Sequence, residues 1–169
     1  MCVCQALSMV ILTGGELFTG NVFFMLTGWL SKKVSAKQLA VNWSVSFLGN
    51  FLGALFIAYM AFQAGTTATQ PWLGATVSVA TFKSSLPLAT AITRGILCNW
   101  MVCTAIWFAT AAQSAAGKFL GIWLLVSSFV AMGFEHSIAN MFLIPLGACA
   151  GLLPGRCARC CDACVQCEA

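Results

Sequence analysis

Four long apolar stretches dominate the pattern of hydrophobic and polar positions along the chain. They cover residues 3–30, 39–62, 86–112 and 119–153. A transmembrane helix needs about 20 mostly apolar residues, so each stretch is long enough to cross a bilayer. The second stretch has no charge and carries Gly49, Gly53 and Ala54, small residues that allow helices to approach closely. The pattern predicts an all-α membrane protein built as a helical bundle.

The composition supports the bilayer as the main solvent. Of the 169 residues, 60% are hydrophobic and 7% are charged, whereas soluble domains carry about 25% charged residues. We therefore expect an integral, multi-pass membrane protein. The net charge of +4 is scattered along the chain, so we expect no nucleic-acid partner. No nucleophile with a base, phosphate loop or cofactor fingerprint stands out, and we expect neither an enzyme nor a bound cofactor.

Lysines predict how the chain is oriented in the membrane. Lys32, Lys33 and Lys37 separate the first two stretches, while the connection at residues 63–82, taken as a loop, has no charge. The positive-inside rule places the lysine-bearing connection in the cytoplasm. It follows that Lys118 lies on the cytoplasmic side and Lys83 near the opposite face.

The first and last stretches are interrupted by polar residues in the same pattern. Residues 14–23 read GGELFTGNVF, and residues 133–142 read GFEHSIANMF. Aligned on Glu16 and Glu135, each has Glu, four residues, Asn, one residue and Phe. Paired, Gly-interrupted apolar segments indicate a transport site at an internal repeat, because irregular backbone at membrane depth must be buried in protein or line a cavity. The alternative is a chance match, or two helix ends packed on each other.

Longer motifs resemble a known family. The sequence reads ELFT at residues 16–19, GN at 49–50, GILCNWMVC at 95–103 and GFEHSIANMF at 133–142. On these residues the chain resembles the formate/nitrite transporter family, from about residue 3 to residue 147. The resemblance implies an aquaporin-like bundle of six spans with the second and fifth broken, related as an inverted repeat. It also implies a homopentamer with one pore per protomer, which moves small monovalent anions such as formate, nitrite, hydrosulfide or lactate, often with protons.

The resemblance implies roles for six residues. They are the central pore histidine His136, the nearby hydrogen-bonding Asn99, Thr19 facing the histidine, Lys83 at the outer vestibule, Leu7 at the cytoplasmic constriction and Phe129 at the opposite one. Val3 stands where the family has a constriction aromatic, so we expect an inner constriction that is looser or differently built.

The family pattern also implies that parts of the bundle are missing. The first span and the start of the second would precede Met1, and the sixth would follow Gly147, so we expect a truncated member with an incomplete bundle. We divide the chain into a partial transmembrane transporter domain, residues 1–153, and a cysteine-rich tail, residues 154–169.

Charge neutralisation explains the mixture of residues in the expected pore. A bare anion in an apolar constriction faces a large desolvation cost, which protonation of a weak acid removes. Histidine titrates near neutral pH, so His136 can lend a proton, while Lys83 raises the local anion concentration. Leu7 and Phe129 would close the pore by dewetting, and backbone N–H groups of the broken helices can face the anion.

Each assignment has an alternative. We assign Glu16, Asn21, Glu135 and Asn140 to bracing the backbone of the broken helices, although paired carboxylates also serve acid–base chemistry. A single histidine can instead be a buried structural hydrogen-bonding group, and Lys83 can be an interfacial lysine that only reaches toward the headgroups.

The remaining cysteines leave the role of the tail open. Cys157, Cys160, Cys161, Cys164 and Cys167 have spacings compatible with zinc or another soft metal, but palmitoylation or a non-native reading frame explains them equally well, and no metal site is assigned. Two other functions stay open. One is a non-transporting membrane fragment that associates with a full-length relative. The other is a membrane-anchored metal binder.

Overall fold

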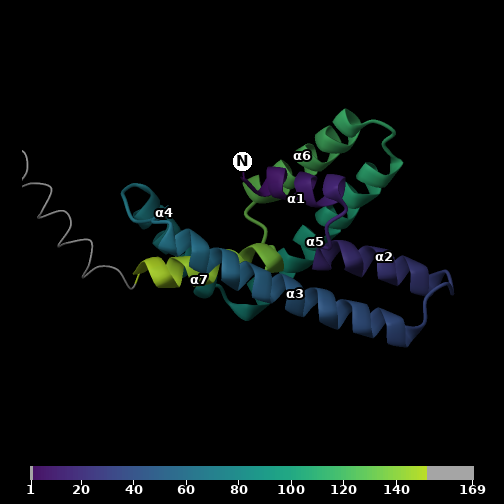
Figure 1. The fold of residues 1–169 in the computed structure, drawn as a ribbon, viewed down its shortest axis with the longest axis horizontal. Coiled ribbons are helices and arrows are strands. Elements are labelled where there is room, and N and C mark those ends of the chain that lie inside the picture. The colour runs from purple at the N-terminus through teal and green to yellow at the C-terminus, as the bar shows by residue number, and fades with distance from the viewer. Residues whose placement is uncertain (1, 152–169) are drawn as a thin grey trace, which may run out of the picture. The chain divides into compact units, whose positions relative to one another are not determined.

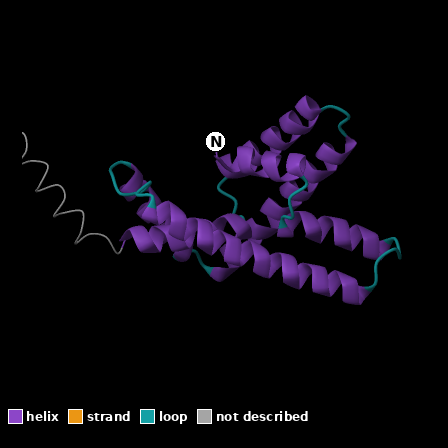
Figure 2. Ribbon diagram, in the orientation of Figure 1, coloured by secondary structure: helices purple, strands orange, loops and turns teal. Residues whose placement is uncertain are grey.

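The part of the chain that the structure describes is helical. The computed structural model describes residues 2–151, with side chains from residue 7 onward. Within that range the helices are α1 (Cys2–Thr13), α2 (Phe18–Leu30), α3 (Ala36–Gln63), α4 (Trp72–Ser84), α5 (Leu88–Ala111), α6 (Ala115–Ala131) and α7 (Ser137–Gly151), as Figures 1 and 2 show. Residues 2–151 contain no β-strand, which confirms the predicted all-α class.

All described helices except α4 follow the four predicted apolar stretches. α3 and α5 are long and apolar enough to cross a membrane, and Leu7–Thr13 with Phe18–Leu30 forms a third candidate span that is bent by 52° at its break. The last stretch forms two shorter apolar helices, α6 and α7. The predicted interruptions of the first and last stretches are therefore both present, at residues 14–17 and 132–136.

One sequence prediction was wrong. The connection at residues 63–82 is not a loop throughout, because α4 begins at Trp72 and runs through Lys83 to Ser84. Its 13 residues span about 20 Å at 1.5 Å per residue, which is too short to cross a bilayer. A search for stretches of spanning length therefore overlooks it.

The described chain divides into two compact units. The first contains the chain up to Leu52 together with Pro87–Ala139, and the second contains Gly53–Leu86 together with the chain from Asn140. In the first unit, α5 packs against α6 and α2, and α1 packs against α6. Ser114 caps α6 by accepting a hydrogen bond from the Gly117 N–H at 3.1 Å, which ends the short connection from α5.

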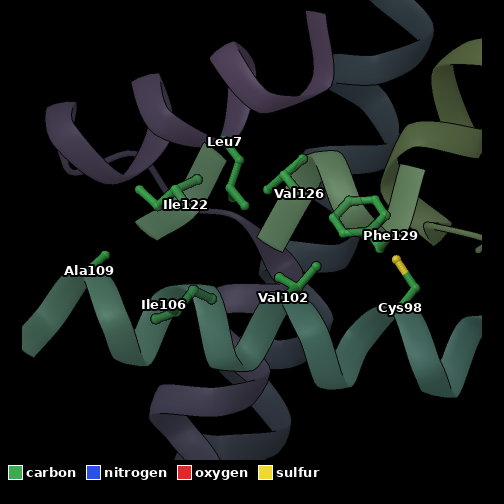
Figure 3. Packing of buried hydrophobic residues seen from close by; sticks show 8 residues of the cluster. All are labelled: Leu7, Cys98, Val102, Ile106, Ala109, Ile122, Val126 and Phe129. Atoms are coloured by element: carbon green, nitrogen blue, oxygen red, sulfur yellow. The ribbon is translucent and has the colours of Figure 1, made fainter. Parts of the chain in front are cut away.

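The core of the first unit is an apolar cluster shared by three helices. Figure 3 shows side chains from α5 facing those of α6 and α1. The members are Leu7 on α1, Cys98, Val102, Ile106 and Ala109 on α5, and Ile122, Val126 and Phe129 on α6. The α5 members recur every three or four residues, so they form one face of the helix. In lipid, such faces associate through van der Waals packing rather than through the hydrophobic effect.

The second unit is held by a close approach of α4 and α7. A Cβ added at Gly147 would lie 2.2 Å from the Ala80 Cβ and 2.9 Å from the Thr76 carbonyl oxygen. Both Gly147 and Ala80 are buried. Only glycine at position 147 lets the two helix backbones come this close.

Candidate functional site

The first helix break is closed by a glycine in the left-handed region. Gly14 has φ +74°, a value that glycine adopts without strain. The Gly15 N–H then donates to the Val10 carbonyl at 2.8 Å. This six-to-one bond is that of a Schellman motif, which satisfies a carbonyl left open at a helix C-terminus. α2 restarts at Phe18, four residues after Gly14.

The second break has the same backbone geometry. Gly133 has φ +69°, its N–H donates to the Val130 carbonyl at 3.1 Å, and the Phe134 N–H donates to the Phe129 carbonyl at 3.1 Å. α7 restarts at Ser137, again four residues after the glycine. The resemblance between the two glutamate motifs therefore extends from the sequence to the backbone, which favours an internal repeat over a chance match.

Amide side chains brace the first break. The Glu16 carboxylate accepts a hydrogen bond from the Asn21 amide, and the Glu16 carbonyl accepts one from the Asn50 Nδ2 at 3.2 Å. Asn50 Nδ2 also donates to the Ser46 carbonyl at 2.9 Å. These bonds join the break to α2 and α3, and they give Glu16 and Asn21 partners suited to a structural role.

Asn50 was missed as a functional residue by the sequence analysis. It carries the resemblance to the family, but its contact with Glu16 joins residues 34 positions apart. The available signal was a set of polar residues that recur at every fourth position of a mainly apolar helix: Gln38, Asn42, Ser46 and Asn50. These four side chains line a groove of about 830 Å³ together with Glu16 and Asn21.

Glu135 lies in the second break and is buried, with 6% of its surface exposed. Its carbonyl oxygen would lie 3.9 Å from a Cβ added at Gly95, so the break approaches the backbone of α5. Asn140, its partner in the sequence pattern, lies on α7 and is half-buried.

His136 is the last residue of the second break and caps α7. Its Nδ1 accepts a hydrogen bond from the Ala139 N–H at 3.1 Å. Because Nδ1 accepts, the neutral imidazole carries its proton on Nε2 and can donate from there. The ring is half-buried and stacks on the Phe129 ring, with centroids 6.1 Å apart and 14° between the planes.

The two predicted constriction residues belong to one apolar cluster. Leu7 is 7% exposed and Phe129 is 2% exposed. Val126 and Ile122 are members of the same cluster, as Figure 3 shows. The structure thus brings Leu7, Phe129 and, through the ring contact, His136 into one region of the first unit.

Thr19 and Asn99 belong to the same unit. Thr19 is 3% exposed, and its hydroxyl is buried with no hydrogen-bond partner in the described structure. The Asn99 Nδ2 donates to the Gly95 carbonyl at 2.9 Å, which leaves its second N–H and its carbonyl oxygen available. Lys83 lies in the second unit, half-buried in the last turn of α4.

The described residues hold no group of three or more His, Cys, Asp or Glu side chains that could bind a metal. The predicted cysteine-rich tail, including Cys157 and Cys167, lies outside the described residues, and the boundary at residue 153 stays a prediction. The side chain of Val3 also lies outside the part that is described.

Comparison with known proteins identifies the family. The formate/nitrite transporter profile matches residues 1–165. The chain belongs to the formate/nitrite transporter family. It is similar to the uncharacterised transporter YrhG of Bacillus subtilis, with 44% identity over 146 residues that cover 86% of this chain and 55% of the relative. It is also similar to a probable formate transporter of Methanothermobacter thermautotrophicus, with 41% identity, 83% of this chain and 57% of the relative covered.

Solved structures agree with this assignment. A pentameric formate channel with formate bound superimposes with a TM-score of 0.80 and 28% identity, over 91% of this chain and 61% of the channel. The family fold, aquaporin-like and helical, is therefore confirmed for the part present, as is an integral, multi-pass membrane protein. Members of this family are transporters and channels rather than enzymes. The chain spans about half the length of the curated relatives it matches.

Proposed function

We propose that this chain forms the pore-lining part of a channel or transporter for small monovalent anions, with formate or nitrite as the substrate class and His136 as its proton link. The observation that carries the proposal is the position of His136. It caps a helix that restarts inside an apolar stretch, with Nδ1 accepting a hydrogen bond from the Ala139 N–H and the ring stacked on Phe129. An intramembrane titratable residue in such a break is suited to a substrate path.

The relatives supply the substrate class. A probable formate transporter and a formate channel with formate bound are both similar to this chain. The chain spans 55% and 57% of two curated relatives, so transport by this chain is itself part of the proposal. Homopentameric assembly in the bilayer is part of the proposal, since a similar formate channel is pentameric.

The transport step follows from the chemistry of the side chains. Lys83 attracts the anion, and the Nε2–H of His136 donates to it. When the imidazole is protonated, it transfers one proton to the anion, which leaves as the neutral acid while the imidazole becomes neutral and is protonated again from water. A neutral acid crosses the apolar cluster of Leu7 and Phe129 at far lower cost than its anion. Protonation of Nδ1 breaks the hydrogen bond from the Ala139 N–H, because that bond uses the Nδ1 lone pair.

Thr19 and Asn99 supply the other donors. The Thr19 hydroxyl is buried without a partner in the described structure, an arrangement that costs free energy unless a ligand uses the group. Asn99 keeps one amide N–H beyond its bond to Gly95. Both groups can donate a hydrogen bond to any small anion, which fits a family that carries several different anions.

Reconstitution of the purified chain in liposomes tests the proposal. Formate or nitrite gradients should change the internal pH, and His136→Asn should abolish the change. Asparagine is a strong helix cap, so this variant keeps the start of α7 while it removes the imidazole; His136→Ala, which removes both, is the comparison. Inserted and folded protein without flux would favour the alternative, a non-transporting fragment that works only with a full-length relative. Flux that survives in His136→Asn would reject the proton link.

A further inference from the structure

A second, smaller cavity opens at the first helix break. Its volume is about 300 Å³, and its walls come from α1, the break, α2 and α5, with a single residue from α6, Lys118. Leu7, the predicted inner constriction residue, is part of the same wall. The cavity therefore adjoins the apolar cluster and is lined by one lysine.

Lys118 occupies an electrostatically unfavourable place. It is the fourth residue of α6, which begins at Ala115 and has no acidic residue in its first turn. The N-terminus of a helix carries positive partial charge, so a cation there is repelled. Lys118 is half-buried, and among the described residues no ion pair compensates it. Such a lysine is suited to an anion that is not part of the chain.

The cavity wall also carries one carboxylate and the first turn of a second helix. Glu16 is the one carboxylate on the wall, and it already accepts a hydrogen bond from the Asn21 amide. Leu17 and Gly20 also line the cavity, which places the first turn of α2 there. That turn adds the positive end of a second helix.

We propose that Lys118 binds small monovalent anions in this cavity, next to the Leu7 side of the apolar cluster. The inference rests on the proposed function, because it makes the cavity a loading site for the same anions. The positive-inside pattern predicts that Lys118 faces the cytoplasm, so the site would serve the inner mouth of the pore.

Anion-dependent thermal unfolding of the full purified chain tests this site. The parent is His136→Asn, in which the pore imidazole is absent, and formate replaces an equal concentration of gluconate so that ionic strength is constant. At ten times its dissociation constant, formate should raise the Tm of the parent by about 3–5 °C. Adding Lys118→Gln should remove this shift, and Lys118→Arg should keep it. Lys33→Gln, an exposed lysine between α2 and α3, is the matched control and should keep the shift.

Three results would overturn the proposal: no formate shift in the parent, a full shift in Lys118→Gln, or loss of the shift in Lys118→Arg as complete as in Lys118→Gln. Flux of the unmodified chain is measured in parallel. A shift that depends on Lys118 in a chain without flux would reject the transport function and retain the site. Flux together with a formate-dependent Tm shift that is unchanged in Lys118→Gln would reject the anion site and retain the transport function.

Discussion

The imidazole ring of His136 lies nearly parallel to the phenyl ring of Phe129, with centroids 6.1 Å apart. Phe129 also accepts the backbone bond from Phe134 that closes the second break. One residue thus fixes the break through its carbonyl and the histidine through its ring. The position of the proposed proton donor depends on the packing of α6.

Phe129→Leu should show this dependence. The backbone bond to Phe134 remains, but the stacked ring is lost and the core is underfilled, so we expect a loss of about 1–1.5 kcal/mol in the free energy of unfolding. Formate flux should fall as well, because His136 loses its support. Phe119→Leu on the same helix, where the side chain is 39% exposed, is the control. Equal changes in the two variants would contradict the special role of Phe129.

Replacing the glycine of either break by alanine should lower the free energy of unfolding more than the same change within a helix. Gly14→Ala and Gly133→Ala each force a Cβ into the left-handed region, so each should cost about 1–2 kcal/mol in denaturant titrations of the protein in detergent. Gly53→Ala lies within α3 with open space around the added Cβ, and alanine favours a helix, so it should be neutral or stabilising. A neutral Gly133→Ala would contradict the Schellman geometry.

The sequence predicted the repeat because its signal is local. Each break is encoded by a glycine two residues before a glutamate, and both Gly14 and Gly133 adopt the backbone that this spacing requires. Contacts between distant residues were not predictable in the same way. The bond from Asn50 to the Glu16 carbonyl depends on how α3 packs beside the break, and no local pattern encodes that packing. α4 was not predicted because its 13 residues are fewer than the about 20 that a transmembrane helix needs.

The approach of α4 to α7 predicts a steric cost at Gly147. Gly147→Ala places a Cβ 2.2 Å from the Ala80 Cβ and 2.9 Å from a backbone oxygen, so the helices must separate, at about 1–3 kcal/mol. Gly151→Ala, whose Cβ would make ordinary contacts at 3.9 Å, should be nearly neutral. Adding Ala80→Gly to Gly147→Ala should recover part of the loss in thermal unfolding. Without recovery, the clash with Ala80 is not the cause.

The buried hydroxyl of Thr19 predicts that stability and transport respond in opposite directions. Thr19→Val keeps the shape of the side chain and removes a hydroxyl that has no partner in the described structure. Because an unsatisfied buried polar group costs about 1–3 kcal/mol, the variant should unfold at the same or a higher temperature. Its formate flux should fall at least tenfold if the hydroxyl donates to the anion, whereas Thr19→Ser should keep the flux. A Thr19→Val protein that is more stable and transports normally would contradict a contact between Thr19 and the anion. His136 and Asn99 would then be the remaining proposed donors to the anion.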